Sequence, residues 1–278
     1  MIPDARMLES HLLPRLMIGT SGYVFDDWVG PFYPKGLSRA DHLRYYAARF
    51  PVVEINATYY RIPAPRSFAA MAGKTPRDFL FIAKANQEMT HRGNRDPDLY
   101  RAYLEAISPL REAGKFDGVL LQFPFGFRND APSRAHLAFL RESLPGMRLW
   151  AEFRHESWNR KEVFDFLRRL SVGFCAVDEP DLPGLMPPVA AATSDTAYVR
   201  FHGRNRETWW GGGHRRYDWD YRAEELSEWL ERIRDLARET ERTYVFFNNC
   251  YMGRAVRGAR LLRELLGLEN EPELQGLF

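Results

Sequence analysis

The 278-residue chain repeats one unit eight times: a short apolar run, a polar residue near its end, and a segment with helical potential. Nearly continuous apolar runs are typical of parallel strands that are buried on both faces, whereas the strands of an antiparallel sandwich alternate. The pattern predicts an α/β fold, a (β/α)₈ barrel of the TIM type. The polar residues at the run ends are Thr20, Asn56, Lys84, Gln122, Arg154, Asp178, His202 and Asn248.

Chain length favours one domain, because barrels of this type take about 250 residues. We expect residues 1–278 to form it, with 1–15 as a short N-terminal extension. Apolar residues recur at helical spacing in three segments, 43–50, 163–170 and 226–237, which should pack on the barrel. Long loops are expected after the first, sixth and seventh strands.

Composition narrows the class of protein. The net charge is +2 and the pI about 8.5, below the range of a dedicated nucleic-acid binder. Cys175 lies inside an apolar run and Cys250 follows the last one, so a disulfide framework is not indicated. The sequence contains neither a secretory signal nor a stretch long enough to span a bilayer. We therefore expect a soluble, cytoplasmic protein without a membrane partner.

Chemistry in such barrels occurs at the C-terminal ends of the strands. Side chains two residues apart share a face of a strand, which pairs Glu54 with Asn56, Glu152 with Arg154, and Arg200 with His202. Together with Lys84, Gln122, Asp178 and Asn248 they predict a mixed ring of acids, bases and amides. We favour a ligand site, and the alternative is a network of mutually paired charges that only caps the core.

Within this ring, we predict an acid/base role for at least one of Glu54, Glu152 and Asp178. Lys84 is interpreted as an anion anchor or ion-pair partner in preference to a Schiff-base nucleophile or general base. For His202, acid/base catalysis, ligand binding and a purely structural place in the wall all stay open.

We predict no cofactor and assign no metal ligand. A catalytic divalent metal is the less favoured alternative, because the spacings match no ligand motif such as HExxH. Its candidate ligands are His202, Glu152 and Asp178, and also His155 and His91.

The loop after the seventh strand combines Arg204 and Arg206 with glycines 211–213. Phosphates often bind TIM barrels at this position, so we consider an anion site there, with a solvated flexible loop as the equal alternative. Several aromatic residues suit either stacking on a sugar or nucleobase or packing over the barrel: Trp28, Trp158, Trp209, Trp210 and Tyr217.

Motifs along most of the chain resemble the YecE-like family, domain of unknown function 72. They lie at 19–34, 53–63, 84–91, 120–127, 151–158, 198–205 and 244–256. The resemblance implies a TIM-type barrel and brings no established reaction. Phe125 and Gly258 are atypical, since a proline and an asparagine are expected there. The family motifs coincide with Glu54, Asn56, Lys84, His91, Gln122, Glu152, Arg154, His155, His202 and Asn248.

The leading hypothesis is an enzyme that uses acid/base chemistry on a small polar or anionic substrate, such as a phosphate-bearing one. The alternatives are a nucleic-acid binder or repair-type phosphodiester hydrolase, and a non-catalytic metabolite-binding protein. The residues expected to bind the substrate are Tyr23, Asn56, Tyr59, His91, Gln122, Arg154, His155, Trp158, Arg200, Arg204, Trp210 and Asn248.

Overall fold

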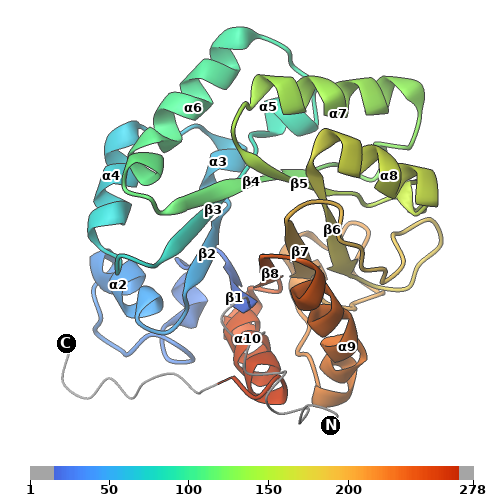
Figure 1. Cartoon of the computed structure of the whole chain (residues 1–278). Helices are drawn as coiled ribbons and strands as arrows, with labels where there is room; N and C mark the ends of the chain where they lie inside the picture. The colour runs from blue at the N-terminus through green and yellow to red at the C-terminus, as the bar shows by residue number, and fades with distance from the viewer. Residues whose placement is uncertain (1–15, 269–278) are drawn as a thin grey trace, which may run out of the picture.

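The computed structural model describes residues 16–268, which form a closed barrel of eight parallel strands (Figure 1). Each strand pairs with the next, and the first pairs with the last. The strands are β1 Leu16–Ser21, β2 Val52–Ile55, β3 Leu80–Lys84, β4 Phe116–Gln122, β5 Arg148–Glu152, β6 Val172–Asp178, β7 Thr196–Phe201 and β8 Arg242–Phe247. The predicted TIM-type barrel is confirmed; the expected 1–15 extension lies outside the described residues.

Helices surround the barrel (Figure 1). Within residues 16–268 they are α2 His42–Ala47, α3 Ala57–Tyr60, α4 Pro65–Gly73, α5 Gln87–Thr90, α6 Pro97–Glu112, α7 Ala131–Ser143, α8 Lys161–Leu170, α9 Ala223–Glu239 and α10 Arg254–Leu265. The three segments with helical spacing correspond to α2, α8 and α9, which bury their apolar faces. None of the helices in this part of the chain has the length and apolar character that a membrane span needs.

The sixth unit departs from the repeat, because residues 179–195 between β6 and β7 contain no helix. Four prolines explain this: Pro180, Pro183, Pro187 and Pro188 lack a backbone N–H donor and obstruct helical hydrogen bonding. The segment instead runs over the barrel end as a strap, and Glu156 N donates a hydrogen bond to Gly184 O at 2.9 Å. We call residues 180–188 the strap.

A large aromatic residue fills the middle of the barrel. Trp150 on β5 is fully buried, and its ring lies 5.0 Å from that of Tyr198 and 5.4 Å from that of Tyr244. The neighbouring strands leave room for it by presenting glycines. A Cβ on Gly118 would lie 2.5 Å from a carbon of the Trp150 ring, and one on Gly173 would lie 2.3 Å away. The packing of this layer therefore requires the large side chain of Trp150 and glycine at positions 118 and 173.

Charged groups close the barrel core at its N-terminal end. Asp117 accepts hydrogen bonds from Arg148 Nη1 at 2.9 Å and Arg242 Nη1 at 3.1 Å, and from the Tyr244 hydroxyl. Asp117 is partly buried, and its two arginine partners compensate its charge at this end of the barrel.

The Trp150 layer generates a stability prediction. Replacing Gly173→Ala forces a Cβ into the indole, and overpacking of this kind costs about 1 to 3 kcal/mol. We expect urea unfolding to show that loss. Gly126→Ala is the matched control, because a Cβ there meets nothing within 4 Å. Equal free energies of unfolding for the two variants would contradict the packing argument.

Candidate functional site

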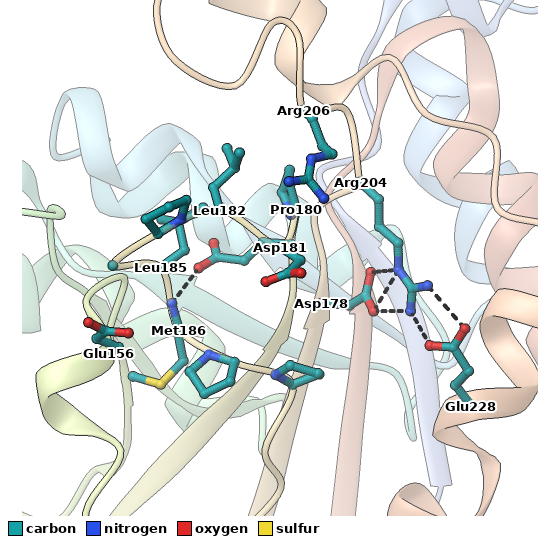
Figure 2. Close-up of a pocket in the computed structure, with 15 residues that line it drawn as sticks. Glu156, Asp178, Pro180, Asp181, Leu182, Leu185, Met186, Arg204, Arg206 and Glu228 are labelled. Atoms are coloured by element: carbon teal, nitrogen blue, oxygen red, sulfur yellow. Dashed lines mark hydrogen bonds and ion pairs between the residues drawn. The ribbon is translucent and has the colours of Figure 1, made fainter.

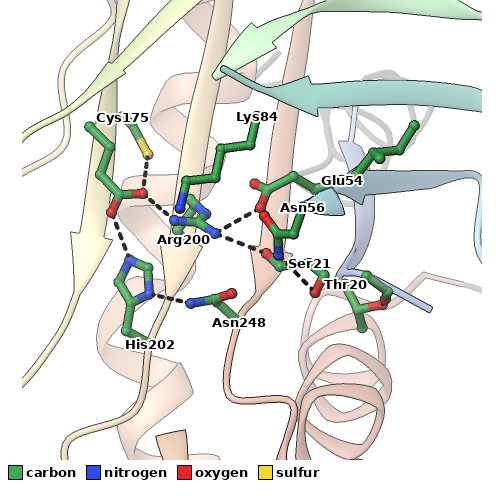
Figure 3. Close-up of polar contacts among 12 residues, drawn as sticks. Thr20, Ser21, Glu54, Asn56, Lys84, Cys175, Arg200, His202 and Asn248 are labelled. Carbon is green, nitrogen blue, oxygen red and sulfur yellow. Dashed lines mark hydrogen bonds and ion pairs between the residues drawn. The ribbon is translucent and has the colours of Figure 1, made fainter. Parts of the chain in front are cut away.

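A buried layer of charges closes the C-terminal end of the barrel core (Figure 3). Arg200 reaches from β7 across the barrel, with Nη1 2.5 Å from Glu152 Oε2 and Nη2 2.7 Å from Glu54 Oε1. The Tyr198 hydroxyl donates to Glu54 Oε2 at 2.7 Å. All four side chains are buried. The predicted inward orientation of Glu54, Glu152 and Arg200 is thus what the structure has, and their charges are mutually paired.

Arg154 connects this layer to the mouth of the barrel. Its Nη2 lies 2.6 Å from Glu152 Oε1, and its Nη1 lies 2.6 Å from Glu179 Oε2. Burial alone would raise the pKa of Glu152, but the charges of Arg154 and Arg200 outweigh it and hold that pKa well below its usual range. Glu152 is therefore an ionised counter-ion and a weak base.

His202 is fully buried beside these groups. Its Nδ1 lies 3.1 Å from Asn248 Nδ2 and 3.5 Å from Arg154 Nη2, and its Nε2 lies 3.3 Å from Glu152 Oε1. Two donors at Nδ1 assign the proton to Nε2, facing the carboxylate. Burial, with Arg154 next, lowers the pKa of His202 to about 3. The imidazole is therefore neutral at neutral pH.

Above this layer lies a cavity of about 320 Å³, which we call the mouth cavity. Its cationic lining residues are Lys84, Arg154 and Arg216. Its aromatic lining residues are Tyr59, Tyr60, Phe125, Trp209, Trp210 and Tyr217, joined by His91, Gln122, Pro124 and Leu185. Among the described residues that line it, none is acidic. The cavity thus combines positive charge with aromatic surface.

Lys84 ends β3 and points into the mouth cavity. Its Nζ lies 4.0 Å from the centroid of the Tyr59 ring, within the range of a cation–π interaction. Within residues 16–268, no acceptor or carboxylate lies within bonding distance of this nitrogen. Burial is the main reason that the pKa of Lys84 falls to about 7, and Arg200 lowers it further while Glu152 and Glu54 oppose the change. A substantial part of the Lys84 population is an unprotonated amine at neutral pH.

His91 lies on the other side of the Tyr59 ring, with ring centroids 5.1 Å apart. Burial, followed by the charges of Lys84 and Arg154, lowers the pKa of His91 to about 4. This histidine is therefore a neutral hydrogen-bonding group and adds no charge to the cavity.

Glu179 was not predicted from the sequence. Its carboxylate accepts from Arg154 Nη1 at 2.6 Å and from Met186 N at 3.2 Å, and burial raises its pKa to about 7. Strand parity is the signal that identifies it. Cys175 on β6 lies 3.8 Å from Glu152, so odd-numbered residues of this strand face the interior.

The same parity turns Asp178 away from the mouth, and this corrects the predicted ring. Its carboxylate accepts from Arg204, from the Tyr221 hydroxyl at 2.5 Å and from Trp229 Nε1 at 2.7 Å. Arg204 also binds Glu228 on α9, as Figure 2 shows. Asp178 and Arg204 line a separate cavity of about 700 Å³, together with the strap and Arg206. Asp178 and Arg204 form an ion pair with each other.

The other predicted binding residues divide into three groups. Those that line the mouth cavity are Tyr59, His91, Gln122, Arg154 and Trp210. Those that lie in or beside the charged layer are Asn56, whose Nδ2 donates to Ser21 O at 3.2 Å, Arg200 and Asn248. Those placed elsewhere are Tyr23, which lines another cavity, His155, whose ring packs behind Phe125, and Trp158, which is fully buried.

The structure shows which of the aromatic residues pack in the core and which line the mouth cavity. Trp28 and Trp158 are core residues, since their Nε1 atoms donate to Cys250 O at 2.7 Å and Phe127 O at 2.8 Å. Trp209, Trp210 and Tyr217 all line the mouth cavity, where Trp209 is buried near His202 and Trp210 is exposed. Glycines 211–213 belong to the turn at the 3-10 helix η5 Gly213–Tyr217.

The two atypical residues occupy packing positions. Phe125 forms part of the wall of the mouth cavity, and its ring contacts Trp210 at 5.0 Å. Gly258 on α10 packs against β8, because a Cβ there would lie 2.6 Å from the Phe247 ring. Phe125 therefore adds aromatic surface where a proline was expected.

A metal centre finds little support in the donor arrangement. Across residues 16–268, no group of three or more His, Cys, Asp or Glu side chains is placed to hold an ion. Of the two acidic candidate ligands, Glu152 is bound by two arginines and Asp178 faces α9.

Comparisons with known proteins identify the relatives of this chain. A family model described as "Protein of unknown function DUF72" matches residues 17–276. The UPF0759 protein YunF of Bacillus subtilis (strain 168) is 29% identical over 272 residues, covering 91% of this chain and 95% of that protein.

Two crystal structures of DUF72 family proteins superpose closely. The protein from Thermotoga maritima MSB8 is 41% identical with a TM-score of 0.84, over 91% of this chain and 99% of that chain. The protein from Enterococcus faecalis V583 is 25% identical with a TM-score of 0.84, over 91% and 96%. The resemblance seen in the sequence motifs is confirmed.

The environment of His202 predicts a pH dependence of stability. Its folded-state pKa of about 3 lies below its value in the unfolded chain, so only the unfolded chain takes up a proton as the pH falls below about 6.5. This contribution to stability is complete above that pH and is lost as the pH falls towards 3.

His202→Gln should reduce the slope of unfolding free energy against pH by an amount approaching 1.4 kcal/mol per pH unit, about the value of one proton, between pH 4.5 and 6. Urea titrations at several pH values measure it. His214→Gln, at an exposed position, serves as the control. An unchanged slope in His202→Gln would show that the buried imidazole is protonated in the folded state.

Proposed function

The chain belongs to the DUF72 family, and from its mouth cavity we propose that it is an enzyme that binds a small anionic substrate and transfers a proton through Lys84. The observation that carries this proposal is the amine of Lys84, which points into a cavity without acidic lining residues and has no hydrogen-bonding partner within residues 16–268.

Charge balance supports the anionic substrate. Glu54 and Glu152 are the carboxylates whose charges act on Lys84, and both are already bound by Arg200. A buried cation without a counter-ion carries a desolvation penalty of several kcal/mol, which a bound anion offsets. Arg154 lines the same cavity and presents a planar guanidinium, the group that matches carboxylate and phosphate geometry. The substrate anion is therefore placed between Lys84 and Arg154.

Proton transfer is assigned to Lys84 because its pKa of about 7 matches the pH at which an enzyme works. The Lys84 ammonium that binds the anion donates a proton to the substrate while it lies over the face of Tyr59. The free amine that remains then takes a proton back from the substrate. This moves the acid/base role from the predicted carboxylates to a residue first interpreted as an anchor.

The predicted acid/base residues receive positioning roles in this proposal. Glu152 is too weak a base, and His202 is neutral and sealed beneath the cavity. Glu152 and Glu54 fix Arg200, and Glu152 with Glu179 fixes Arg154. Asp178 has no role in the mouth.

The anion site is tested with sulfate, whose charge is constant near neutral pH. We expect calorimetry to detect sulfate binding to the wild type and a loss of at least tenfold in affinity for Lys84→Met, because the uncommitted cation is removed. Lys161→Met is the matched control, since Lys161 is exposed on α8 and pairs with Asp165. Equal sulfate affinity in all three proteins would refute the anion site.

Catalysis is tested separately by proton exchange. Incubation of the protein in D₂O with a pool of small carboxylates and phosphate esters should place deuterium in at least one compound, detected by mass spectrometry. Lys84→Arg should retain sulfate binding and lose exchange, because a guanidinium keeps its proton. If sulfate binds but no compound exchanges or changes, the protein is an anion-binding protein without this chemistry.

A further inference from the structure

Aromatic side chains at the rim of the mouth cavity extend the description of its ligand. Resting on the anion site proposed above, we propose that the substrate also carries a flat aromatic ring, which packs against Trp210 and Tyr60 while its anionic group contacts Lys84 and Arg154. The ligand class is an anionic group attached to a single planar ring or base.

Few large apolar side chains of the described residues are exposed to solvent. Only five are exposed within residues 16–268, namely Val29, Tyr60, Trp210, Tyr251 and Met252. The two most exposed are Tyr60 at 73% and Trp210 at 55%, and both line the mouth cavity. Unburied aromatic surface gives up the free energy that burial would supply, so the presence of the two most exposed rings at one cavity indicates a partner that covers them.

Tyr60 and Trp210 approach the cavity from different parts of the rim. Tyr60 ends α3, just after β2, and Trp210 lies in the loop after β7. In the closed barrel these two strands are separated by β1 and β8 on one side and by four strands on the other. A ring that enters the cavity can therefore contact aromatic surface from both loops.

Each exposed ring is held by a second ring. Trp210 makes an edge contact with Phe125 at 5.0 Å, and Phe125 in turn packs on His155 at 5.0 Å. Tyr60 makes an edge contact with Tyr59 at 5.0 Å. Aromatic side chains fixed before binding lose little conformational freedom when a ligand arrives. The aromatic surface at the rim is thus preorganised for ligand binding.

The aromatic surface continues into the cationic part of the cavity. Tyr59 contacts Tyr60 with its edge and lies beneath Lys84 Nζ at 4.0 Å, and Arg154 lies 5.6 Å from the Trp209 ring. One ligand can therefore reach the cations with an anionic group while its ring remains at the rim. A volume of about 320 Å³ is near the lower limit of ligand pockets, which favours one ring system.

Calorimetry with matched phosphate esters tests the ring. Phenyl phosphate should bind the wild type about tenfold more tightly than methyl phosphate, because the ring stacks on the rim. Cyclohexyl phosphate, similar in size but not flat, should bind less tightly than phenyl phosphate. Trp210→Ala should reduce the preference for phenyl over methyl phosphate, because only Tyr60 is left to contact the ring. Tyr251→Ala is the control, because it removes an exposed aromatic ring that does not line the cavity.

The outcomes separate this inference from the anion site. If no phosphate ester binds the wild type, the anion site itself is wrong. If methyl and phenyl phosphate bind equally, or cyclohexyl phosphate equals phenyl phosphate, the anion site stands and the flat ring is refuted. Adenosine 5′-monophosphate distinguishes the source of the ring: tighter binding than phenyl phosphate identifies a nucleotide, and weaker binding a simple aryl anion.

Discussion

The buried guanidinium of Arg200 is the interaction on which the C-terminal half of this barrel depends. It lies between Glu54 and Glu152, and removing a partner from such a buried pair costs about 3 to 5 kcal/mol, because a charge is left uncompensated. By binding both acids, Arg200 separates the apolar interior from the mouth cavity. It also leaves Lys84 without a carboxylate of its own, since the two acids whose charges act on Lys84 are already paired with Arg200. The positive character of the mouth therefore follows from the way the layer beneath it is neutralised.

The sequence predicts a site residue where the alternation of side chains along a strand shows which residues face the barrel interior. Glu54, Glu152 and Arg200 were correctly placed because each lies inside or at the end of a clear apolar run, where alternation fixes the face. On β6 the end of the apolar run predicts the wrong acid. Asp178 ends the run and turns to Arg204 and α9, whereas the acid that faces inward is Glu179. Strand boundaries are the least certain part of any pattern, and a shift of one residue exchanges the two faces.

Other features depended on contacts between segments far apart in the chain. No spacing indicates that Glu228 on α9 would bind Arg204 and remove it from an anion site, or that Trp158 would be buried while Trp210 stays exposed. The strap is a similar case: its prolines predict a loop, yet its function in the site comes from two contacts. Met186 N binds Glu179, and Leu185 reaches the wall of the mouth cavity. The missing helix of the sixth unit thus allows the strap to hold the acid that fixes Arg154.

Counting charges connects these elements to the proposed chemistry. Glu54, Glu152 and Glu179 face Arg154, Arg200 and Lys84, so the cluster is neutral when all six are ionised. It is also neutral when Lys84 has lost its proton and Glu179 holds one, and burial brings the pKa of both groups to about 7. Two neutral forms that differ by the position of one proton are a property of the coupled cluster and not of either residue alone. When Lys84 and Glu179 are both protonated, the cluster carries one net positive charge. A singly charged anion bound at Lys84 and Arg154 then makes the cluster and its ligand neutral together. In the proposed reaction, Glu179 therefore adjusts the charge of the cluster, and Lys84 exchanges the proton with the substrate.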